Sequence, residues 1–224
     1  MRHDEKAEAD KYLNLRRRMV EDQLIRRGIK APRVLAAMVA VPRHEFMPPD
    51  QRADAHYDGA VPIGEGQTIS QPYMVALMVE LLEVKPTARV LEVGAGSGYQ
   101  AAVLGELAAE VYGVELIPAL AKRAAATLQR LGYANVHIVV GDGSKGYAEA
   151  APYDGIIVAA AAPDISPAWV EQLKPGGRIV APIGSLHSQV CTVAEKRGDS
   201  LHTVHNIGCV FVPLRGEYGW DTPR

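Results

Sequence analysis

Two spacings of hydrophobic residues alternate through the middle of the chain. Short apolar runs that are typical of buried strands are followed by segments in which apolar residues recur at helical intervals. The runs that predict strands are residues 89–93, 110–115, 136–140, 155–159 and 178–182. The segments that predict helices are 118–131 and 167–173, and a helix after Ser70 that carries Met74, Leu77, Met78, Leu81 and Leu82. This alternation predicts an α/β fold with a doubly wound, mostly parallel sheet and helices on both faces.

The N-terminal part of the chain departs from this alternation. Residues 7–27 carry an imperfect helical stripe, and Gly28 is placed to end that helix in a left-handed conformation. Pro32 fits the first turn of a second helix, which must stop near Val41-Pro42. Residues 48–68 are rich in proline and glycine and predict a long loop, and loops of this length are usually functional.

The C-terminal part changes the spacing again. Two extended runs, 189–196 and 202–212, predict an antiparallel pair of strands that completes the sheet. A chain of 224 residues without an evident linker fits a single domain. We therefore expect one domain over 1–224, composed of N-terminal helices with a substrate loop (1–69), a core (70–188) and C-terminal strands (189–224).

The first strand of the core ends in three glycines spaced two apart, Gly94, Gly96 and Gly98. Alternate glycines let a ligand approach the backbone, and the helix that follows offers unpaired N–H groups at its start. A dinucleotide fingerprint, G-x-G-x-x-G, would need its third glycine at the position of Tyr99. This mismatch weakens the interpretation as a nicotinamide dehydrogenase, which we keep as a distant alternative.

Acidic residues follow the next two predicted strands. Glu115 ends the second strand, and Asp142 lies in Gly141-Asp142-Gly143 at the end of the third. The carboxyl ends of parallel strands meet at one edge of a sheet, where ligands of such folds bind. A carboxylate at the end of the second strand can accept two hydrogen bonds from a ribose with both hydroxyls free.

The sequence from Glu92 to Gly98 has the form E-x-G-x-G-x-G, which resembles motif I of Rossmann-like methyltransferases that use S-adenosyl-L-methionine. The resemblance implies that Glu115 binds the ribose hydroxyls and that Asp142 contacts the adenine, with S-adenosyl-L-homocysteine as the product. For Glu92, an equal alternative is a buried contact that pins the loop. The implied cofactor-binding residues are Glu92, Gly94, Gly96, Ser97, Gly98, Glu115, Asp142 and Gly143.

The fourth strand is followed by Ala159-Ala160-Ala161-Ala162-Pro163, where enzymes of this class that methylate adenine amino groups keep an Asn/Asp-Pro-Pro-aromatic signature. With no polar group in this segment, the acceptor is more simply one that is already charged at neutral pH, such as a carboxylate with a pKa of about 4. Methylation of a phenol or thiol stays open, because any of the 7 histidines could serve as a base.

Short motifs along the chain closely resemble one family, the protein-L-isoaspartate (D-aspartate) O-methyltransferases, over about residues 19–217. They are Val41-Pro42-Arg43-His44-Glu45-Phe46, Gly66-Gln67-Thr68-Ile69-Ser70-Gln71-Pro72, Gly141-Asp142-Gly143, Ala160-Ala161-Ala162-Pro163, Gln172-Leu173-Lys174-Pro175-Gly176-Gly177 and Val212-Pro213-Leu214. The resemblance implies protein repair: a methyl group passes from S-adenosyl-L-methionine to the α-carboxylate of L-isoaspartyl residues in damaged proteins and peptides. The methyl ester then closes to a succinimide.

The same resemblance makes Ser70 the catalytic residue. It also implies substrate binding by a short set of neighbours, which are Thr68, Ile69, Val61, Pro62 and Ile63. Considered without the family, Ser70 is the expected N-cap of the helix that follows, a role worth about 1 kcal/mol, and the two roles are compatible. Arg215 replaces a small polar residue usual in the family. Its charge either assists the substrate carboxylate or faces solvent, and we favour solvent.

Composition limits the partners of the protein. The formal net charge is −2 and 48% of the residues are hydrophobic, which is typical of a globular protein and unsuited to bulk nucleic-acid binding. Cys191 and Cys209 lie outside any CxxC spacing, so we expect no metal site and no disulfide. No run approaches the roughly 20 apolar residues of a membrane helix. We expect a cytoplasmic protein, monomeric, that binds neither nucleic acid nor membrane.

Two other functions remain open at this point. One is a methyltransferase that acts on a small molecule or a nucleic acid. The other is a module that binds S-adenosyl-L-methionine without turnover. We expect His44, His56 and His137 to be structural residues, not catalytic bases.

Overall fold

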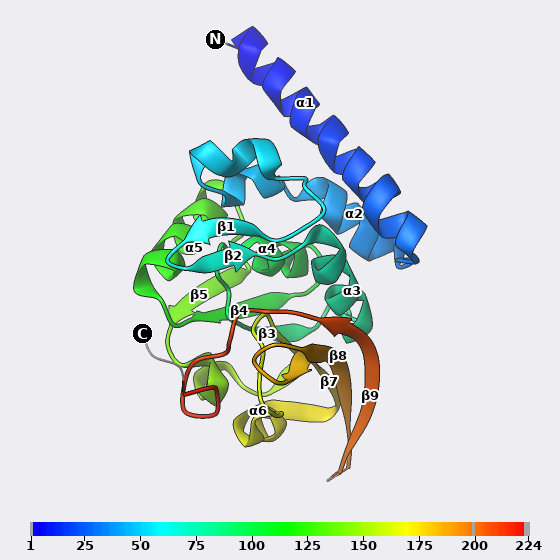
Figure 1. Ribbon diagram of the computed structural model, residues 1–224, viewed down its shortest axis with the longest axis vertical. Helices are drawn as coiled ribbons and strands as arrows, with labels where there is room; N and C mark the ends of the chain where they lie inside the picture. Colours follow the sequence, from blue (N-terminus) through cyan, green and yellow to red (C-terminus); the bar gives the residue numbers. More distant parts are fainter. Residues whose placement is uncertain (1, 199, 222–224) are drawn as a thin grey trace.

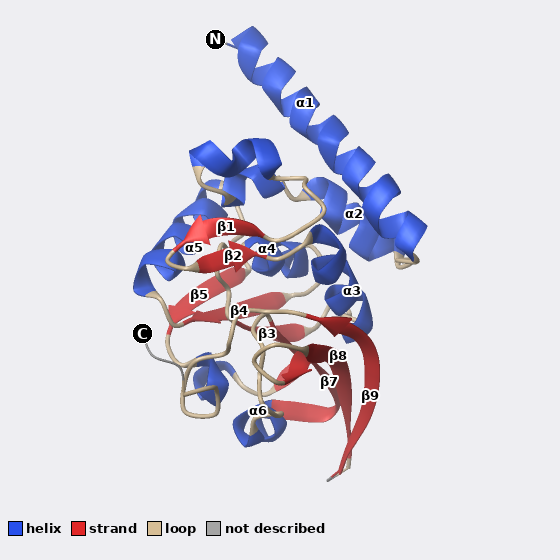
Figure 2. Ribbon diagram, viewed as in Figure 1, coloured by secondary structure: helices blue, strands red, loops and turns tan. Residues whose placement is uncertain are grey.

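A seven-stranded sheet forms the centre of the molecule in the computed structural model, which describes residues 2–198 and 200–221 (Figure 1). The strand order is β5-β4-β3-β6-β7-β8-β9. The strands are β3 (Arg89–Val93), β4 (Glu110–Glu115), β5 (Val136–Val140), β6 (Tyr153–Val158), β7 (Leu173–Gly184), β8 (Gln189–Arg197) and β9 (Ser200–Cys209). The first five strands are parallel, and β8 and β9 are antiparallel to their neighbours. The mostly parallel sheet with an antiparallel C-terminal pair is confirmed (Figure 2).

Helices cover both faces of this sheet, because successive side chains of each strand point to opposite sides. Val90 of β3 belongs to one buried cluster and its neighbour Leu91 to the other. The first face packs against α3 (Pro72–Leu82), α4 (Tyr99–Gly105) and α5 (Pro118–Arg130). The second face packs against α6 (Pro167–Gln172) through the fully buried Trp169, beside the 3₁₀ turns η5 (Gly143–Lys145) and η6 (Ala148–Ala150).

The N-terminal helix is longer and less regular than its sequence predicts. α1 (Arg2–Met19) continues as a π-helical turn, η1 (Val20–Leu24), and a 3₁₀ turn, η2 (Ile25–Arg27), and its first turns extend away from the sheet (Figure 1). Gly28 ends the helix with φ +94°, and Pro32 begins α2 (Pro32–Ala40), both as expected. Within residues 2–198 and 200–221, no helix is both long and apolar enough to cross a membrane.

The loop predicted for residues 48–68 is structured, which corrects that prediction. After η3 (Arg43–Phe46) it contains a 3₁₀ helix, η4 (Pro49–Asp54), and an antiparallel hairpin of β1 (Val61–Gly64) and β2 (Gln67–Ile69). The hairpin forms because buried and exposed side chains alternate along β1, and Gly64, Glu65 and Gly66 turn with positive φ. It lies beside α4 and α5, above the carboxyl ends of the parallel strands (Figure 1).

Two boundaries near the C-terminus also differ from the prediction. The strand predicted to begin at residue 178 already begins at Leu173 as β7, and its pairing with β6 shifts: Leu173 is opposite Tyr153 and Arg178 is opposite Gly155. The glycines of this segment allow the strand to bulge without ending. The extended run predicted to reach residue 212 leaves the sheet after Cys209.

Candidate active site

The glycine turn between β3 and α4 has the conformation that its sequence predicts. Gly94, Gly96 and Gly98 have φ values of +82°, +54° and +83°, a region of backbone conformation that residues other than glycine rarely adopt. A Cβ atom on Gly98 would lie 3.0 Å from the Cβ of Ala124 in α5. The backbone N–H of Gly94 donates to the carbonyl of Val114 at 2.8 Å, so the turn stays against the end of β4.

Glu115 holds the turn from the end of β4. Its Oε2 accepts a hydrogen bond from the N–H of Gly96, and its Oε1 accepts one from the N–H of Ile117, both at 2.8 Å. A carboxylate has about four acceptor positions, so two bonds leave room for more. Glu115 lines the cavity beside the turn, and its carboxylate can therefore fix the loop and bind hydroxyl groups of a ligand.

Glu92 does not hold the turn. Its side chain is fully buried, and neither carboxylate oxygen has a hydrogen-bond partner within residues 2–198 and 200–221. Burial raises the pKa of Glu92 well above its ordinary value; the neighbouring Gln100 opposes this shift, and the charge of Glu115 adds to it. The alternative in which Glu92 pins the loop is wrong, because Glu115 and the Val114 carbonyl make those bonds.

Asp142 joins the end of β5 to the C-terminal segment. One oxygen accepts hydrogen bonds from the N–H and the hydroxyl of Ser144 at 2.9 and 2.6 Å, and the other accepts from the N–H of Glu217 at 2.9 Å. Gly143 lies so close to β3 that a Cβ atom would be 2.7 Å from a methyl group of Val93. A contact of Asp142 with an adenine would therefore add to a structural role that the sequence did not reveal.

The C-terminal segment packs against the alanine-rich segment that follows β6. The N–H of Ala161 donates to the carbonyl of Val212, and the N–H of Leu214 donates to the carbonyl of Ala161, both at 2.8 Å. The indole N–H of Trp220 reaches the same carbonyl at 3.1 Å. Small side chains at this strand end let the C-terminal backbone approach, and the sequence offered no sign of this contact beyond the Val212-Pro213-Leu214 motif.

Three cavities meet at the carboxyl ends of the strands, and Thr68 and Ala159 line all of them. The first, of about 70 Å³, lies at the glycine turn and includes Gly94, Gly96, Glu115, Leu116, Ile117, Gly143 and Arg215. The second, of about 460 Å³, includes Gly59, Ala60, Ser70, Met74, Cys209, Phe211 and Val212. The third, of about 30 Å³, joins Ser70 to Glu92, Ser97 and Gln100. We call the first two the cofactor cavity and the acceptor cavity.

The favoured expectation, that Arg215 faces solvent, holds only in part. Its side chain is partly buried and lines the cofactor cavity beside Leu116 and Ile117. The C-terminal segment reaches this place because Val212 and Leu214 pair with Ala161. Sequence distance hides this neighbourhood, since about 100 residues separate Arg215 from Leu116.

Ser70 is not the N-cap of α3, which corrects the prediction that it caps this helix. The N-cap is Gln71, Pro72 occupies the first helical position, and no side chain caps this helix. Ser70 therefore lies one residue outside the helix, where its hydroxyl has no hydrogen-bond partner within the residues that the structure describes, and it lines both the acceptor cavity and the small cavity above Glu92.

The predicted substrate-binding residues of the hairpin divide into two groups. Val61, Ile63 and Ile69 are buried in the core, at most 4% exposed, so most of their surface is committed to packing. Pro62 and Thr68 face outward as cross-strand neighbours. The alternation of side chains along a strand decides this division, and Thr68 is the residue of the pair that lines the cavities.

The histidines near the N-terminal helices are buried away from these cavities. His44 stacks on Tyr12 with ring centroids 3.7 Å apart, and burial lowers the pKa of His44 to about 4. Burial likewise lowers the pKa of His56 to about 4. His137 lies within β5 beside the ring of Tyr112. None of the three lines the cavities at the glycine turn.

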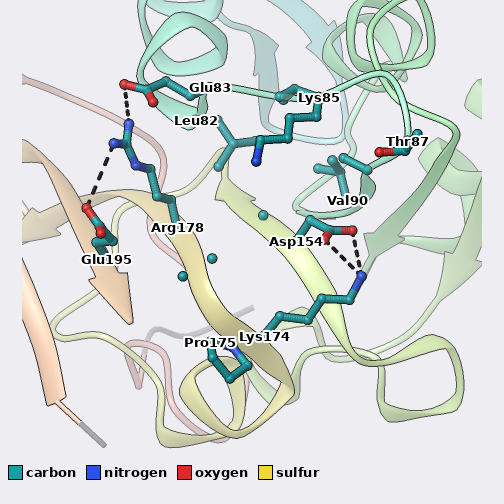
Figure 3. A pocket seen from close by; sticks show the side chains of 15 residues that line it. Leu82, Glu83, Lys85, Thr87, Val90, Asp154, Lys174, Pro175, Arg178 and Glu195 are labelled. Atoms are coloured by element: carbon teal, nitrogen blue, oxygen red, sulfur yellow. Dashed lines mark hydrogen bonds and ion pairs between the residues drawn. The ribbon is translucent and has the colours of Figure 1, made fainter. Parts of the chain in front are cut away.

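A separate polar cavity of about 330 Å³ lies at the opposite, amino ends of β3, β6 and β7 (Figure 3). Five of its charged side chains form ion pairs, Lys174 with Asp154 and Arg178 with Glu83 and Glu195, and Lys85 also lines it. Ligands of open α/β sheets bind at the carboxyl ends of the strands. The cavity at the glycine turn is therefore the candidate cofactor site.

The glycine turn, the carboxylate at the end of β4 and the unpaired buried carboxyl of Glu92 fit a nucleoside ligand with a charged tail. Together with the mixed seven-stranded sheet they define an S-adenosyl-L-methionine-dependent methyltransferase. The chain belongs to the protein-L-isoaspartate(D-aspartate) O-methyltransferase (PCMT) family, whose model matches residues 15–219.

Individual relatives agree with the family model. A protein-L-isoaspartate O-methyltransferase of Roseiflexus sp. (strain RS-1) is 51% identical over 213 residues, which cover 95% of this chain and 97% of the relative. A solved protein-L-isoaspartate O-methyltransferase superposes with a TM-score of 0.81 at 30% identity, covering 91% of this chain and 67% of that one. A Plasmodium falciparum PCMT in complex with S-adenosyl-L-homocysteine gives 0.77 at 25% identity, covering 89% and 98%.

Proposed function

We propose that Ser70 orients the acceptor carboxylate for methyl transfer at the junction of the cofactor and acceptor cavities. Membership of the family gives the reaction, which is protein repair by methylation of L-isoaspartyl residues with S-adenosyl-L-methionine as the methyl donor. The main support for this role is that the hydroxyl of Ser70 caps no helix, while its side chain lines the acceptor cavity together with Thr68 and Ala159.

The chemistry asks little of the protein beyond placement. An α-carboxylate has a pKa of about 4, so it is already the nucleophile at neutral pH and needs no base. When bound, S-adenosyl-L-methionine supplies a methyl group on a sulfonium centre. The Ser70 hydroxyl can donate a hydrogen bond to the non-attacking oxygen, and alignment of this kind lowers the barrier by several kcal/mol. The segment from Ala159 to Ala162 places only apolar side chains beside Val212.

The cofactor is held by backbone and carboxylate groups in this proposal. The turn from Gly94 to Gly98, including Ser97, faces its charged tail, and Glu115 accepts hydrogen bonds from its ribose hydroxyls. Asp142 and Gly143 border its adenine. Three observations support these roles: the positive φ values of the glycines, the two backbone N–H groups whose hydrogen bonds orient Glu115, and the position of Gly143 in the cofactor cavity.

The acceptor side accommodates a peptide in the same proposal. Pro62 and Thr68 present the outer face of the hairpin, and Val61, Ile63 and Ile69 support it from the core. We also propose a monomer that works as a single domain in the cytoplasm, without a nucleic-acid or membrane partner. The formal net charge of −2 supports the absence of bulk nucleic-acid binding. Light scattering on the purified protein should then give the mass of one chain, 24.1 kDa.

The substrate is tested with labelled S-adenosyl-L-methionine and a peptide pair that differs only in an isoaspartyl or an aspartyl linkage. We expect label in the isoaspartyl peptide alone, as a base-labile ester. Equal labelling of both peptides, or of neither, would contradict the proposal.

The role of Ser70 is tested against a serine that does cap a helix. Ser166 accepts a hydrogen bond from the N–H of Ala168 at the start of α6. The Ser166 hydroxyl also donates to the carbonyl of Ser144 at 2.7 Å, so Ser166→Ala should cost about 2 kcal/mol of stability while the folded protein keeps its turnover. Ser70→Ala should lower kcat at least 10-fold and change the melting temperature little. A stability loss with intact turnover in Ser70→Ala would return the serine to a structural role.

A further inference from the structure

Arg43 is a cation buried without a counter-charge. Its side chain is 0% exposed, and it takes part in no salt bridge within residues 2–198 and 200–221. Burial lowers the pKa of Arg43 to about 10, so the guanidinium stays charged at neutral pH. An unpaired buried charge costs several kcal/mol. The contacts of Arg43 must therefore account for its burial.

The guanidinium joins three segments that surround the acceptor side of the site. Its Nε donates to the carbonyl of Ala55 at 2.6 Å, and its Nη2 donates to the carbonyl of Ser70 at 2.8 Å. Its central carbon lies 4.7 Å from the ring centroid of Tyr99, close enough for a cation–π contact. Ala55 follows η4 before the β1–β2 hairpin, Ser70 follows the hairpin, and Tyr99 is the first residue of α4 after the glycine turn.

These contacts place one rigid group between the acceptor side and the cofactor turn. The carbonyl of Ser70 belongs to the residue whose hydroxyl faces the acceptor cavity, so fixing that carbonyl limits where the hydroxyl can point. Arginine suits this role because its planar fork donates in fixed directions and stacks on an aromatic face, whereas lysine offers a point charge. A displacement of about 1 Å at such a group can cost about 100-fold in rate.

We propose that Arg43 is a positioning residue for methyl transfer, acting through the Ser70 backbone and the Tyr99 ring. The proposal rests on the function proposed for Ser70 above. It assigns a task to the Val41-Pro42-Arg43-His44 motif, whose arginine touches neither the cofactor cavity nor the acceptor cavity.

The test is a double-mutant cycle of Arg43→Lys and Ser70→Ala, read as kcat and KM for an isoaspartyl peptide and as S-adenosyl-L-homocysteine affinity by calorimetry. We expect Arg43→Lys to lower kcat/KM for the peptide 10- to 100-fold with the wild-type serine and less than 3-fold in the Ser70→Ala background. S-adenosyl-L-homocysteine affinity should change less than 3-fold. Non-additivity of this kind measures coupling between the two residues.

Arg16→Lys is the matched control. Arg16 is also buried, at 9% exposed, and its Nε donates to a backbone carbonyl, that of Val39, at 2.6 Å outside the site. It should lose stability to a similar extent while the folded protein keeps its kcat/KM. If Arg43→Lys does not purify folded, Arg43→Gln, which can still donate to one carbonyl, replaces it in the cycle.

The outcomes separate the two proposals. Equal losses from Arg43→Lys in both serine backgrounds, or wild-type kcat/KM in folded Arg43→Lys, would overturn the positioning role and leave that of Ser70 intact. Wild-type kcat in Ser70→Ala would refute the serine's role instead, and with it this route for Arg43.

Discussion

The Glu92→Gln substitution keeps the shape of a fully buried side chain and removes its ability to ionise. In the wild type both carboxylate oxygens lack hydrogen-bond partners within the described residues, and burial raises the pKa of Glu92 well above the ordinary value of 4.5. The folded protein therefore keeps this proton at pH values at which the unfolded chain has released it. Between 4.5 and the raised value, the stability of the wild type falls as pH rises.

The size of the effect follows from the missing partners. An unpaired buried polar group costs about 1–3 kcal/mol, and a charged one costs more. Glu92→Gln should therefore be more stable than the wild type by at least about 1 kcal/mol at pH 8, and the difference should vanish near pH 4. For a domain of this size, 1 kcal/mol corresponds to about 2–4 °C in melting temperature.

The assay is thermal unfolding of both proteins from pH 4 to pH 9, without cofactor. A parallel titration with S-adenosyl-L-homocysteine in buffers of different ionisation enthalpy shows whether binding moves a proton in the wild type alone. A stability difference that does not vary with pH, or a wild type that is more stable at pH 8, would refute the assignment of Glu92 as an unpaired buried acid.

Three further predictions concern the turn, the acid stability and the cavity. Gly98→Ala and Gly132→Ala impose the same backbone strain, about 1–2 kcal/mol, since both glycines have φ +83°. Only Gly98→Ala also meets a neighbour, the Cβ of Ala124 at 3.0 Å, so it should lose more stability than Gly132→Ala. Calorimetry should show weakened S-adenosyl-L-homocysteine binding in Gly98→Ala alone. Burial depresses the pKa of His44 and of His56 to about 4, so the unfolded chain binds more protons than the folded protein below pH 6.5. Stability should therefore fall as pH drops from 6.5 to 4. The difference between the urea midpoints at pH 7 and pH 4.5 should be smaller in His56→Gln than in the wild type, and an unchanged difference would contradict this assignment. The cofactor cavity of about 70 Å³ is far below the roughly 300 Å³ of typical ligand sites, so we expect the hairpin and residues 212–215 to shift when a nucleoside binds. Hydrogen exchange should then change in both segments on S-adenosyl-L-homocysteine binding, and a change in neither would refute the movement.

The strands and helices of the core could be read from sequence because their signals are local. β4 and β5 occupy the predicted residues 110–115 and 136–140, and the glycine turn has the left-handed conformations that its spacing predicts. Periodicity and glycine placement act over a few residues, so they need no knowledge of the fold. The wrong N-cap at Ser70 was also a local matter: Pro72 favours the first helical position, which places the cap at Gln71.

The sequence by itself thus determined the fold class, the turn and, through family motifs, the reaction. Tertiary structure alone decided what surrounds them. Glu115 pins the turn 19 residues away, Arg43 reaches Ser70 and Tyr99, and the C-terminal segment fills the end of β6 at Ala161. These contacts join residues far apart in the chain, and hydrogen-bond partners at that distance leave no periodic trace in a single sequence.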